Sequence, residues 1–273
     1  MARVAIVGEH WSTLSAAARL AVAGHDVDLI KTNSVSDTPL NITLPAALRD
    51  LFLKTGSPLE DSVELKDLDT MFTFTLEGTS FAMPGVGIGA AVSAITERFG
   101  QRSGTQWKSL MTAAQIRWDS IRHTVEDPLP NVRPSWWKPK QSLSRQLRGT
   151  SEPVQAIVHK SLEIDGPKNE PLTAQHIVLP YVASTFGMYA VQGGSTALHR
   201  ALLDRCLALG VHRRESLATA DIVVTDSRFE KTEDPTAVDI DIYRRVGPQV
   251  SMSVLAGSAV SKAINERLRL NGG

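Results

Sequence analysis

The pattern of apolar and polar residues at the start of the chain predicts a strand, a helix and a second strand. Residues 2–7 form a short apolar run before a glycine, and residues 26–30 alternate polar and apolar side chains. Residues 14–23 are rich in Ala and Leu, which favours a helix whose start Ser12 or Thr13 can cap. This order within about 30 residues is typical of a βαβ unit, so we predict an α/β fold with a parallel sheet.

The middle of the chain is predicted to be helical, with one β-hairpin. Residues 70–76 and 79–83 flank a Glu-Gly pair that suits a hairpin turn. Apolar spacing predicts three helices, over residues 45–54, 90–98 and 106–121. Polar residues and two prolines predict a loop over 32–45.

The last third of the chain returns to a mixture of strand and helix. An apolar stretch, 177–189, contains β-branched and aromatic residues, and a Gly-Gly turn then precedes a predicted helix over 196–209. Residues 222–225 read I-V-V-T, which predicts a buried strand. A final helix is predicted over 254–268, and small residues in its first turns allow another backbone to approach closely.

Composition and charge describe an ordinary globular protein. The 29 Lys and Arg residues balance 29 Asp and Glu residues, which argues against a nucleic-acid-binding protein. A single cysteine, Cys206, excludes an internal disulfide, and the histidines lack metal-ligand spacing, so we predict no metal site. The sequence shows neither a secretory signal nor a long apolar span, so we expect a cytoplasmic location.

The neutral total conceals one basic segment, residues 131–148. It contains five Lys or Arg residues and no acidic residue, and Trp136 and Trp137 precede Lys138 within it. Amphipathic rings with flanking cations suit an anionic membrane surface, so we predict that these three residues support peripheral membrane contact and ligand access. The alternative is a Pro-rich loop whose tryptophans pack on the core.

A set of short stretches, in order along the chain, carries a family resemblance. They are V-A-I-V-G-E-H-W at the start, L-P-A-A-L-R-D-L-F (44–52), L-E-D-S-V-E-L-K-D-L-D-T-M-F (59–72), E-G-T-S-F-A-M-P (77–84), P-Y-V-A-S-T-F-G-M-Y-A-V-Q-G-G-S-T-A-L-H-R-A-L (180–202), A-D-I-V-V (220–224) and V-G-P-Q-V-S-M-S-V-L-A-G-S-A-V (246–260). Together they resemble the phytoene desaturase family, which are flavoprotein carotenoid dehydrogenases of the amine-oxidase-like group. The chain is much shorter than typical members.

The resemblance implies a Rossmann-like parallel-sheet domain with a smaller inserted helical and hairpin substrate domain. We place the first in residues 1–57 plus 181–273 and the insertion in residues 58–180. The family binds FAD in the first domain and holds long apolar substrates between the two. An apolar ligand of the polyene or isoprenoid type is therefore implied.

The first turn of the expected FAD site departs from the family pattern. A dinucleotide site needs G-x-G-x-x-G, so that the backbone can approach the diphosphate and the helix can pack on the strand. Here the six positions are residues 8–13, and only Gly8 is retained. His10 places a ring where the backbone should be bare, and Glu9 competes with phosphate for the helix N-terminus.

Two further parts of the expected site are also altered. Lys31 stands where an acid should bind the ribose, and it offers no acceptor to a hydroxyl. The family's Gly-Gly-Arg loop has no counterpart between residues 32 and 43. We therefore predict no tightly bound cofactor, with FAD held at Gly8 and Gly247 as the alternative. Lys31 could instead meet the 2′-phosphate of NADP, although the glycines would still be missing.

Candidate catalytic residues lie in and beside the apolar stretch at 177–189. His176, Tyr181 and Tyr189 could act as acid or base groups or line a cavity, and the alternative is that they are ordinary core or surface residues. Asp226 and Arg228 directly follow the strand at 222–225, at the end where α/β sheets place ligands.

Three functions are compatible with these patterns. The first is a phytoene-desaturase-like protein without tight FAD binding, which holds a polyene or isoprenoid and catalyses a flavin-independent isomerisation or cyclisation. The second is an active FAD-dependent oxidoreductase. The third is a non-catalytic partner of such an enzyme.

Overall fold

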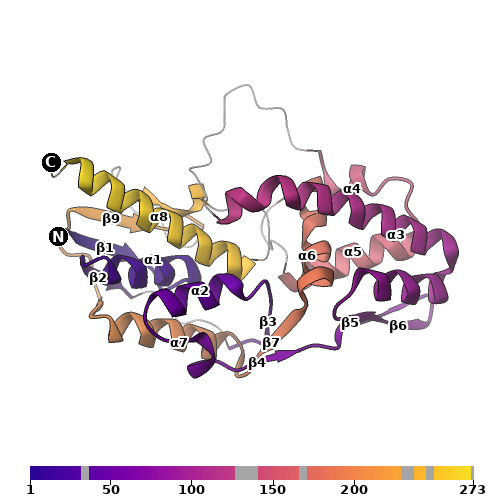
Figure 1. The fold of residues 1–273 in the computed structure, drawn as a ribbon, viewed down its shortest axis with the longest axis horizontal. Helices are drawn as coiled ribbons and strands as arrows, with labels where there is room; N and C mark the ends of the chain where they lie inside the picture. Colours follow the sequence, from indigo (N-terminus) through magenta and orange to yellow (C-terminus); the bar gives the residue numbers. More distant parts are fainter. Residues whose placement is uncertain (32–36, 127–140, 166–170, 229–236, 244–248, 272–273) are drawn as a thin grey trace.

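The computed structural model describes residues 1–31, 37–126, 141–165, 171–228, 237–243 and 249–271, and it confirms the predicted α/β fold. The elements form two groups (Figure 1). A parallel sheet and its helices occupy one end of the molecule. The long helix α3 (Ile88–Glu126), further helices and a β-hairpin occupy the other.

Five parallel strands form the main sheet, in the order β10-β9-β1-β2-β8. Their bounds are β1 Arg3–Val7, β2 Asp26–Ile30, β8 His212–Arg214, β9 Ile222–Thr225 and β10 Val238–Asp239. The predicted strands at 2–7, 26–30 and 222–225 are thus confirmed. Apolar side chains of β1, β2 and β9 are buried, as expected for a parallel sheet that is covered on both faces.

The edge strand β8 is not predicted by the apolar pattern, because its three residues are His and Arg and all are exposed. Ion pairs fix it instead. Arg214 Nε lies 3.0 Å from Asp28 Oδ1, and Arg3 Nη2 lies 2.8 Å from Asp28 Oδ2. Burial alone would raise the pKa of Asp28, but the two guanidinium groups outweigh it and lower that pKa. Charged side chains also protect an edge strand from pairing with another chain.

Four helices share a hydrophobic core with this sheet: α1 (Trp11–Val22), α2 (Ala46–Lys54), α7 (Gly194–Ala208) and α8 (Gln249–Asn271). α1 begins earlier than the predicted residue 14, and α8 earlier than residue 254. The two helices pack closely, as the small residues predict. A Cβ atom on Gly257 of α8 would lie only 2.2 Å from the backbone oxygen of Ser12 in α1.

The second group contains the predicted hairpin, formed by β5 (Thr70–Leu76) and β6 (Thr79–Pro84). The helices predicted at 90–98 and 106–121 are parts of α3, which bends at Gly100, where φ is 84° and ψ is 163°. The remaining helices are α4 Leu143–Gln146, α5 Glu152–Asp165, α6 Val178–Phe186 and the 3-10 helix η2 Ala174–Ile177. α6 accounts for most of the apolar stretch at 177–189.

A small antiparallel sheet connects the two groups, in the order β3-β7-β4. It contains β3 (Leu40–Thr43), β4 (Leu65–Asp67) and β7 (Met188–Val191). The loop prediction for residues 32–45 is therefore wrong over β3. That strand is short and forms by pairing with β7, which is nearly 150 residues away in sequence. Two further 3-10 helices are η1 (Leu59–Asp61) and η3 (Ile240–Tyr243).

Buried apolar residues form two hydrophobic clusters. One surrounds the parallel sheet and includes Leu14, Leu29 and Phe52. The other lies among α3, α5, α6 and the hairpin and includes Trp107 and Tyr181. Leu255 of α8 packs against both clusters. The division into residues 1–57 plus 181–273 and residues 58–180 stays a prediction.

Candidate functional site

The topology of the parallel sheet marks one crevice. From β1 the strand order runs through β2 to β8 on one side and through β9 to β10 on the other. In open α/β sheets, ligands bind at the carboxyl ends of the strands where the order reverses. This switch point lies between β1 and β9, so the candidate site is formed by the residues that follow those two strands.

Gly8 makes the tight turn after β1. Its φ is 98°, a conformation that favours glycine, and its N–H donates to the Ile30 carbonyl at 3.1 Å. His10 is the N-cap of α1, which corrects the prediction that Ser12 or Thr13 caps this helix. The His10 N–H donates to Thr13 Oγ1 at 2.8 Å. The threonine that replaces the third glycine thus closes the first turn of the helix.

Glu9 is buried, with only 4% of its surface exposed, and its carboxylate forms a two-pronged ion pair with Arg213 of β8. Since β2 lies between β1 and β8, this pair connects the first turn to the far edge of the sheet. The Glu9 hydrogen bond raises the pKa of Arg213. His199 Nε2 lies 3.0 Å from the Glu9 backbone oxygen.

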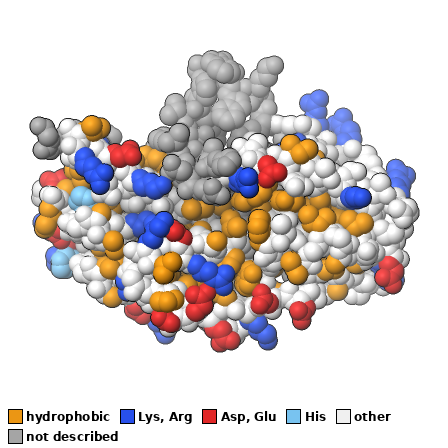
Figure 2. Space-filling view, viewed as in Figure 1, with side chains coloured by type: hydrophobic (Ala, Val, Ile, Leu, Met, Phe, Trp, Pro, Cys, Tyr) orange, Lys and Arg blue, Asp and Glu red, His pale blue; other side chains and the backbone are white. Residues whose placement is uncertain are grey.

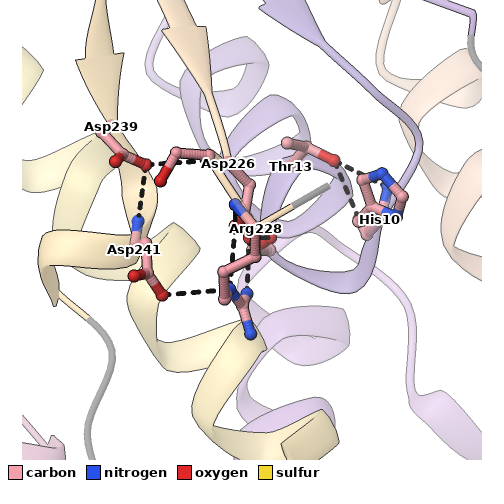
Figure 3. Close-up of polar contacts among 8 residues, drawn as sticks. His10, Thr13, Asp226, Arg228, Asp239 and Asp241 are labelled. Carbon is pink, nitrogen blue, oxygen red and sulfur yellow. Dashed lines mark hydrogen bonds and ion pairs between the residues drawn. The ribbon is translucent and has the colours of Figure 1, made fainter. Parts of the chain in front are cut away.

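Asp226 follows β9 and is fully buried. Its Oδ2 accepts a hydrogen bond from Ser12 Oγ at 2.6 Å, and Arg228 donates to both carboxylate oxygens, at 2.9 and 2.5 Å (Figure 3). Arg228 Nε also lies 3.0 Å from Asp241 Oδ1. The guanidinium therefore stands between two carboxylates beside the start of α1.

Asp239, at the end of β10, stabilises this arrangement through its carboxylate. Its Oδ1 accepts hydrogen bonds from the backbone N–H groups of Ser227 and Asp241, at 3.1 and 3.0 Å. Figure 3 shows how these contacts tie the turn after β9 to the start of η3. The positions of Asp226, Arg228 and Asp241 are thus fixed by backbone contacts as well as by their charges.

Two ionisable groups in the crevice have shifted pKa values. Burial alone would raise the pKa of Asp226, but hydrogen bonds and charge from Arg228, with a further hydrogen bond from Ser12, lower it overall. Burial lowers the pKa of the His10 imidazole. Asp226 opposes this lowering and Arg228 adds to it. At neutral pH the crevice therefore holds a charged Asp226 and a neutral His10.

The predicted catalytic residues lie on three separate elements outside this crevice. His176 is buried in η2, where its Nδ1 accepts from the Thr173 N–H at 2.8 Å. Tyr181 lies in the core around α6. Tyr189 lies on β7, packs against the other core, and donates its hydroxyl to the Phe186 oxygen at 3.3 Å. Their catalytic role stays a prediction.

Other predicted residues have simpler outcomes. Lys31, at the end of β2, lies 3.4 Å from Glu215 Oε1 on the surface. Gly247, Trp136, Trp137 and Lys138 lie outside the described residues. Within the described ranges, no helix is long and apolar enough to cross a bilayer.

Sequence reasoning placed Asp226 and Arg228 at the correct end of the sheet, but it missed their partners. Asp226 and Arg228 were visible because they directly follow an apolar strand. Arg213 gave no such signal, since it lies in a strand without apolar residues. Ser12 was assigned to a helix cap rather than to a contact with a residue 214 positions away.

No protein-family model and no curated sequence matches the chain. Among solved structures, the chain is similar to the PF1083 protein from Pyrococcus furiosus, with a TM-score of 0.53 and 15% identity over 89% of this chain and 63% of that one. An oxidoreductase from Methanosarcina mazei gives a TM-score of 0.46 and 13% identity, over 82% of this chain and 58% of that one. A putrescine oxidase gives a TM-score of 0.46 and 18% identity, over 82% of this chain and 57% of that one.

Of these three similarities, the one to the Pyrococcus protein has a TM-score above 0.5, and at 15% identity it shows the fold alone. The match to the Pyrococcus protein covers 89% of this chain, so most of this arrangement recurs in a solved structure. The chain therefore has the Rossmann-like α/β fold that the sequence predicts. It spans less than two thirds of the length of each of the three proteins. None of the three is described as a phytoene desaturase, and that finer resemblance stays a prediction.

Proposed function

We propose that this chain is a phytoene-desaturase-like protein that does not hold FAD tightly and that binds an apolar ligand of the polyene or isoprenoid type. One observation carries the first part. Two buried carboxylates, Glu9 and Asp226, stand at the carboxyl ends of β1 and β9, and each is already matched by an arginine of the chain.

Electrostatics and space both make this crevice a poor fit for a dinucleotide. The diphosphate of FAD is an anion that proteins bind with cationic side chains and N–H donors. Arg213 and Arg228 are each engaged by a carboxylate of the chain, so each pair is close to neutral and adds little attraction for a diphosphate. The His10 and Thr13 side chains also replace the two glycines that would let the backbone approach the diphosphate.

The apolar ligand is supported by the family resemblance and by aromatic residues at the end of α6. Phe186 is 41% exposed, and its ring centroid lies 6.3 Å from that of buried Trp118 on α3. Tyr189 donates its hydroxyl to the Phe186 backbone oxygen at the same place. Figure 2 shows that hydrophobic side chains also gather in a band on the face of the molecule drawn there. Of the three predicted acid or base groups, Tyr189 is the one that contacts the backbone of an exposed aromatic residue, Phe186.

The absorbance spectrum of the freshly purified full chain tests the cofactor part of the proposal. We expect no flavin absorbance band, because the crevice is filled by paired side chains. A yellow protein that releases FAD on denaturation would contradict the proposal and support the FAD-dependent oxidoreductase. The matched titration adds FAD to the colourless protein, and no saturable quenching of flavin fluorescence is expected.

Turnover then separates the two flavin-independent functions. A polyene that is isomerised or cyclised by the chain alone would support catalysis, and Tyr189→Phe is expected to reduce that rate with little effect on the affinity for the polyene. Activity that appears only with a second enzyme would support the non-catalytic partner. The comparison needs no assumption about the identity of the polyene, since a panel of chain lengths can be used.

We also propose that the basic segment, residues 131–148, makes peripheral contact with a membrane. Arg145 and Arg148, at the end of the basic segment, are both exposed. We expect the double variant Trp136→Ala, Trp137→Ala to reduce sedimentation with vesicles that contain anionic lipid, and added salt to reduce it further. The control Ile116→Ala removes an apolar side chain that is 67% exposed elsewhere, and it should change nothing. Equal sedimentation of the double variant and the wild type would rule out this contact.

A further inference from the structure

We infer that the Asp226 carboxylate is a built-in anion that occupies a phosphate-type site of the switch-point crevice. The donors that remain when this carboxylate is disregarded would suit an inorganic diphosphate or a related oxyanion. The inference deepens the proposed loss of tight FAD binding and rests on it, because it assigns the cause to one side chain.

The Asp226 carboxylate is buried beside the start of α1. Asp226 has no exposed surface, and Ser12, its partner at 2.6 Å, is equally buried in the first turn of α1. The first turn of a helix is its positive end and stabilises anions. A buried carboxylate at this point therefore receives the stabilisation that a bound phosphate receives in related folds.

Arg228 and Ser12 donate hydrogen bonds to the Asp226 carboxylate. The Arg228 side chain forms two hydrogen bonds to Asp226, and 20% of its surface is exposed to solvent. A guanidinium, a serine hydroxyl and a helix N-terminus together are the groups that proteins use to bind phosphate oxygens. The guanidinium of Arg228 and the hydroxyl of Ser12, in the first turn of α1, both donate to Asp226, as Figure 3 shows for the arginine. The carboxylate thus takes the place of a ligand rather than standing beside an empty site.

The charges around Arg228 disfavour a bound anion in the wild type. Arg228 forms ion pairs with both Asp226 and Asp241, so two carboxylates share its charge. Asp239 fixes Asp241 through its backbone N–H, which keeps the second carboxylate in place. An added anion would compete with both carboxylates for Arg228 in the wild type. Without the Asp226 charge, it would compete with only one of them.

The test measures binding of inorganic pyrophosphate to the full chain by titration calorimetry at low salt. The variants are Asp226→Ala, which removes charge and volume, and Asp226→Asn, which removes the charge alone. We expect at least about a tenfold gain in affinity for Asp226→Ala over the wild type and a smaller gain for Asp226→Asn. Adding Ser12→Ala or Arg228→Met to Asp226→Ala should remove the gain, because each deletes a donor.

A control and a fold check make the result decisive. Asp50→Ala removes a carboxylate that pairs with Arg19 and Lys54 on the surface, and it should leave pyrophosphate binding unchanged. If Asp226→Ala does not fold by circular dichroism, the comparison rests on Asp226→Asn. A folded variant without any gain, or an equal gain in Asp50→Ala, overturns the inference. FAD in the purified wild type would instead overturn the proposed function, so the two failures are distinguishable.

Discussion

Replacing Gly257 by alanine is expected to lower the free energy of unfolding by about 3 kcal/mol, because the new methyl group has no space. Its Cβ would lie 2.2 Å from the Ser12 backbone oxygen and 2.9 Å from the Ala16 backbone nitrogen. These are backbone atoms of α1 and cannot rotate away. The two helices would have to separate, and the contact between Ser15 Oγ and the Val254 carbonyl, 2.8 Å in length, would be stretched.

Gly89→Ala is the matched control for this substitution. Gly89 also lies in a helix, the start of α3, and a Cβ there would meet no atom within 4 Å. Alanine is the better helix former, so this variant should gain about 0.5–1 kcal/mol. Urea denaturation of both variants and the wild type measures the difference. A Gly257→Ala protein as stable as the wild type would show that α1 and α8 are not in close contact.

The elements that the sequence predicts are those whose stability comes from local patterns. β1, α1 and β2 have apolar runs and spacing that suffice to identify each of them, and the β5–β6 hairpin has its turn residues Glu77 and Gly78. β3 and β8 are different. β3 is a four-residue strand that forms by pairing with a distant segment, and β8 consists of charged residues held by Asp28 and Glu9. No periodicity marks such strands.

The candidate site was predictable in its location but not in its contacts. Its place follows from the altered glycine pattern after the first predicted strand and from Asp226 and Arg228, which directly follow the predicted strand at 222–225. The pairing of Glu9 with Arg213 and of Ser12 with Asp226 joins residues more than 200 positions apart. Only the folded sheet brings β1, β8 and β9 together, so the charge balance of the crevice could not be derived from the sequence.

Asp226→Asn is expected to lower the free energy of unfolding by about 3 kcal/mol at pH 7, and this loss should depend on pH. The substitution leaves Arg228 largely buried beside a neutral amide, and breaking a buried ion pair on one side has a cost of this size. The pKa of Asp226 is lowered in the folded protein, so its carboxylate stabilises the fold above the ordinary Asp pKa of about 3.9. That stabilisation is lost as the pH falls through the lowered pKa of the folded state.

The stability difference between the wild type and Asp226→Asn should therefore be constant between about pH 5 and pH 7 and shrink below about pH 4. Denaturant titrations at several pH values measure it. Asp241→Asn is the control, because this carboxylate reaches Arg228 from the more exposed side and should contribute about 1 kcal/mol or less. The Gly257→Ala loss is steric and should show no such dependence on pH. An equal loss of unfolding free energy in Asp226→Asn at low and neutral pH would mean that the loss comes from packing of the amide. The charge of Asp226 would then not stabilise the residues around the crevice.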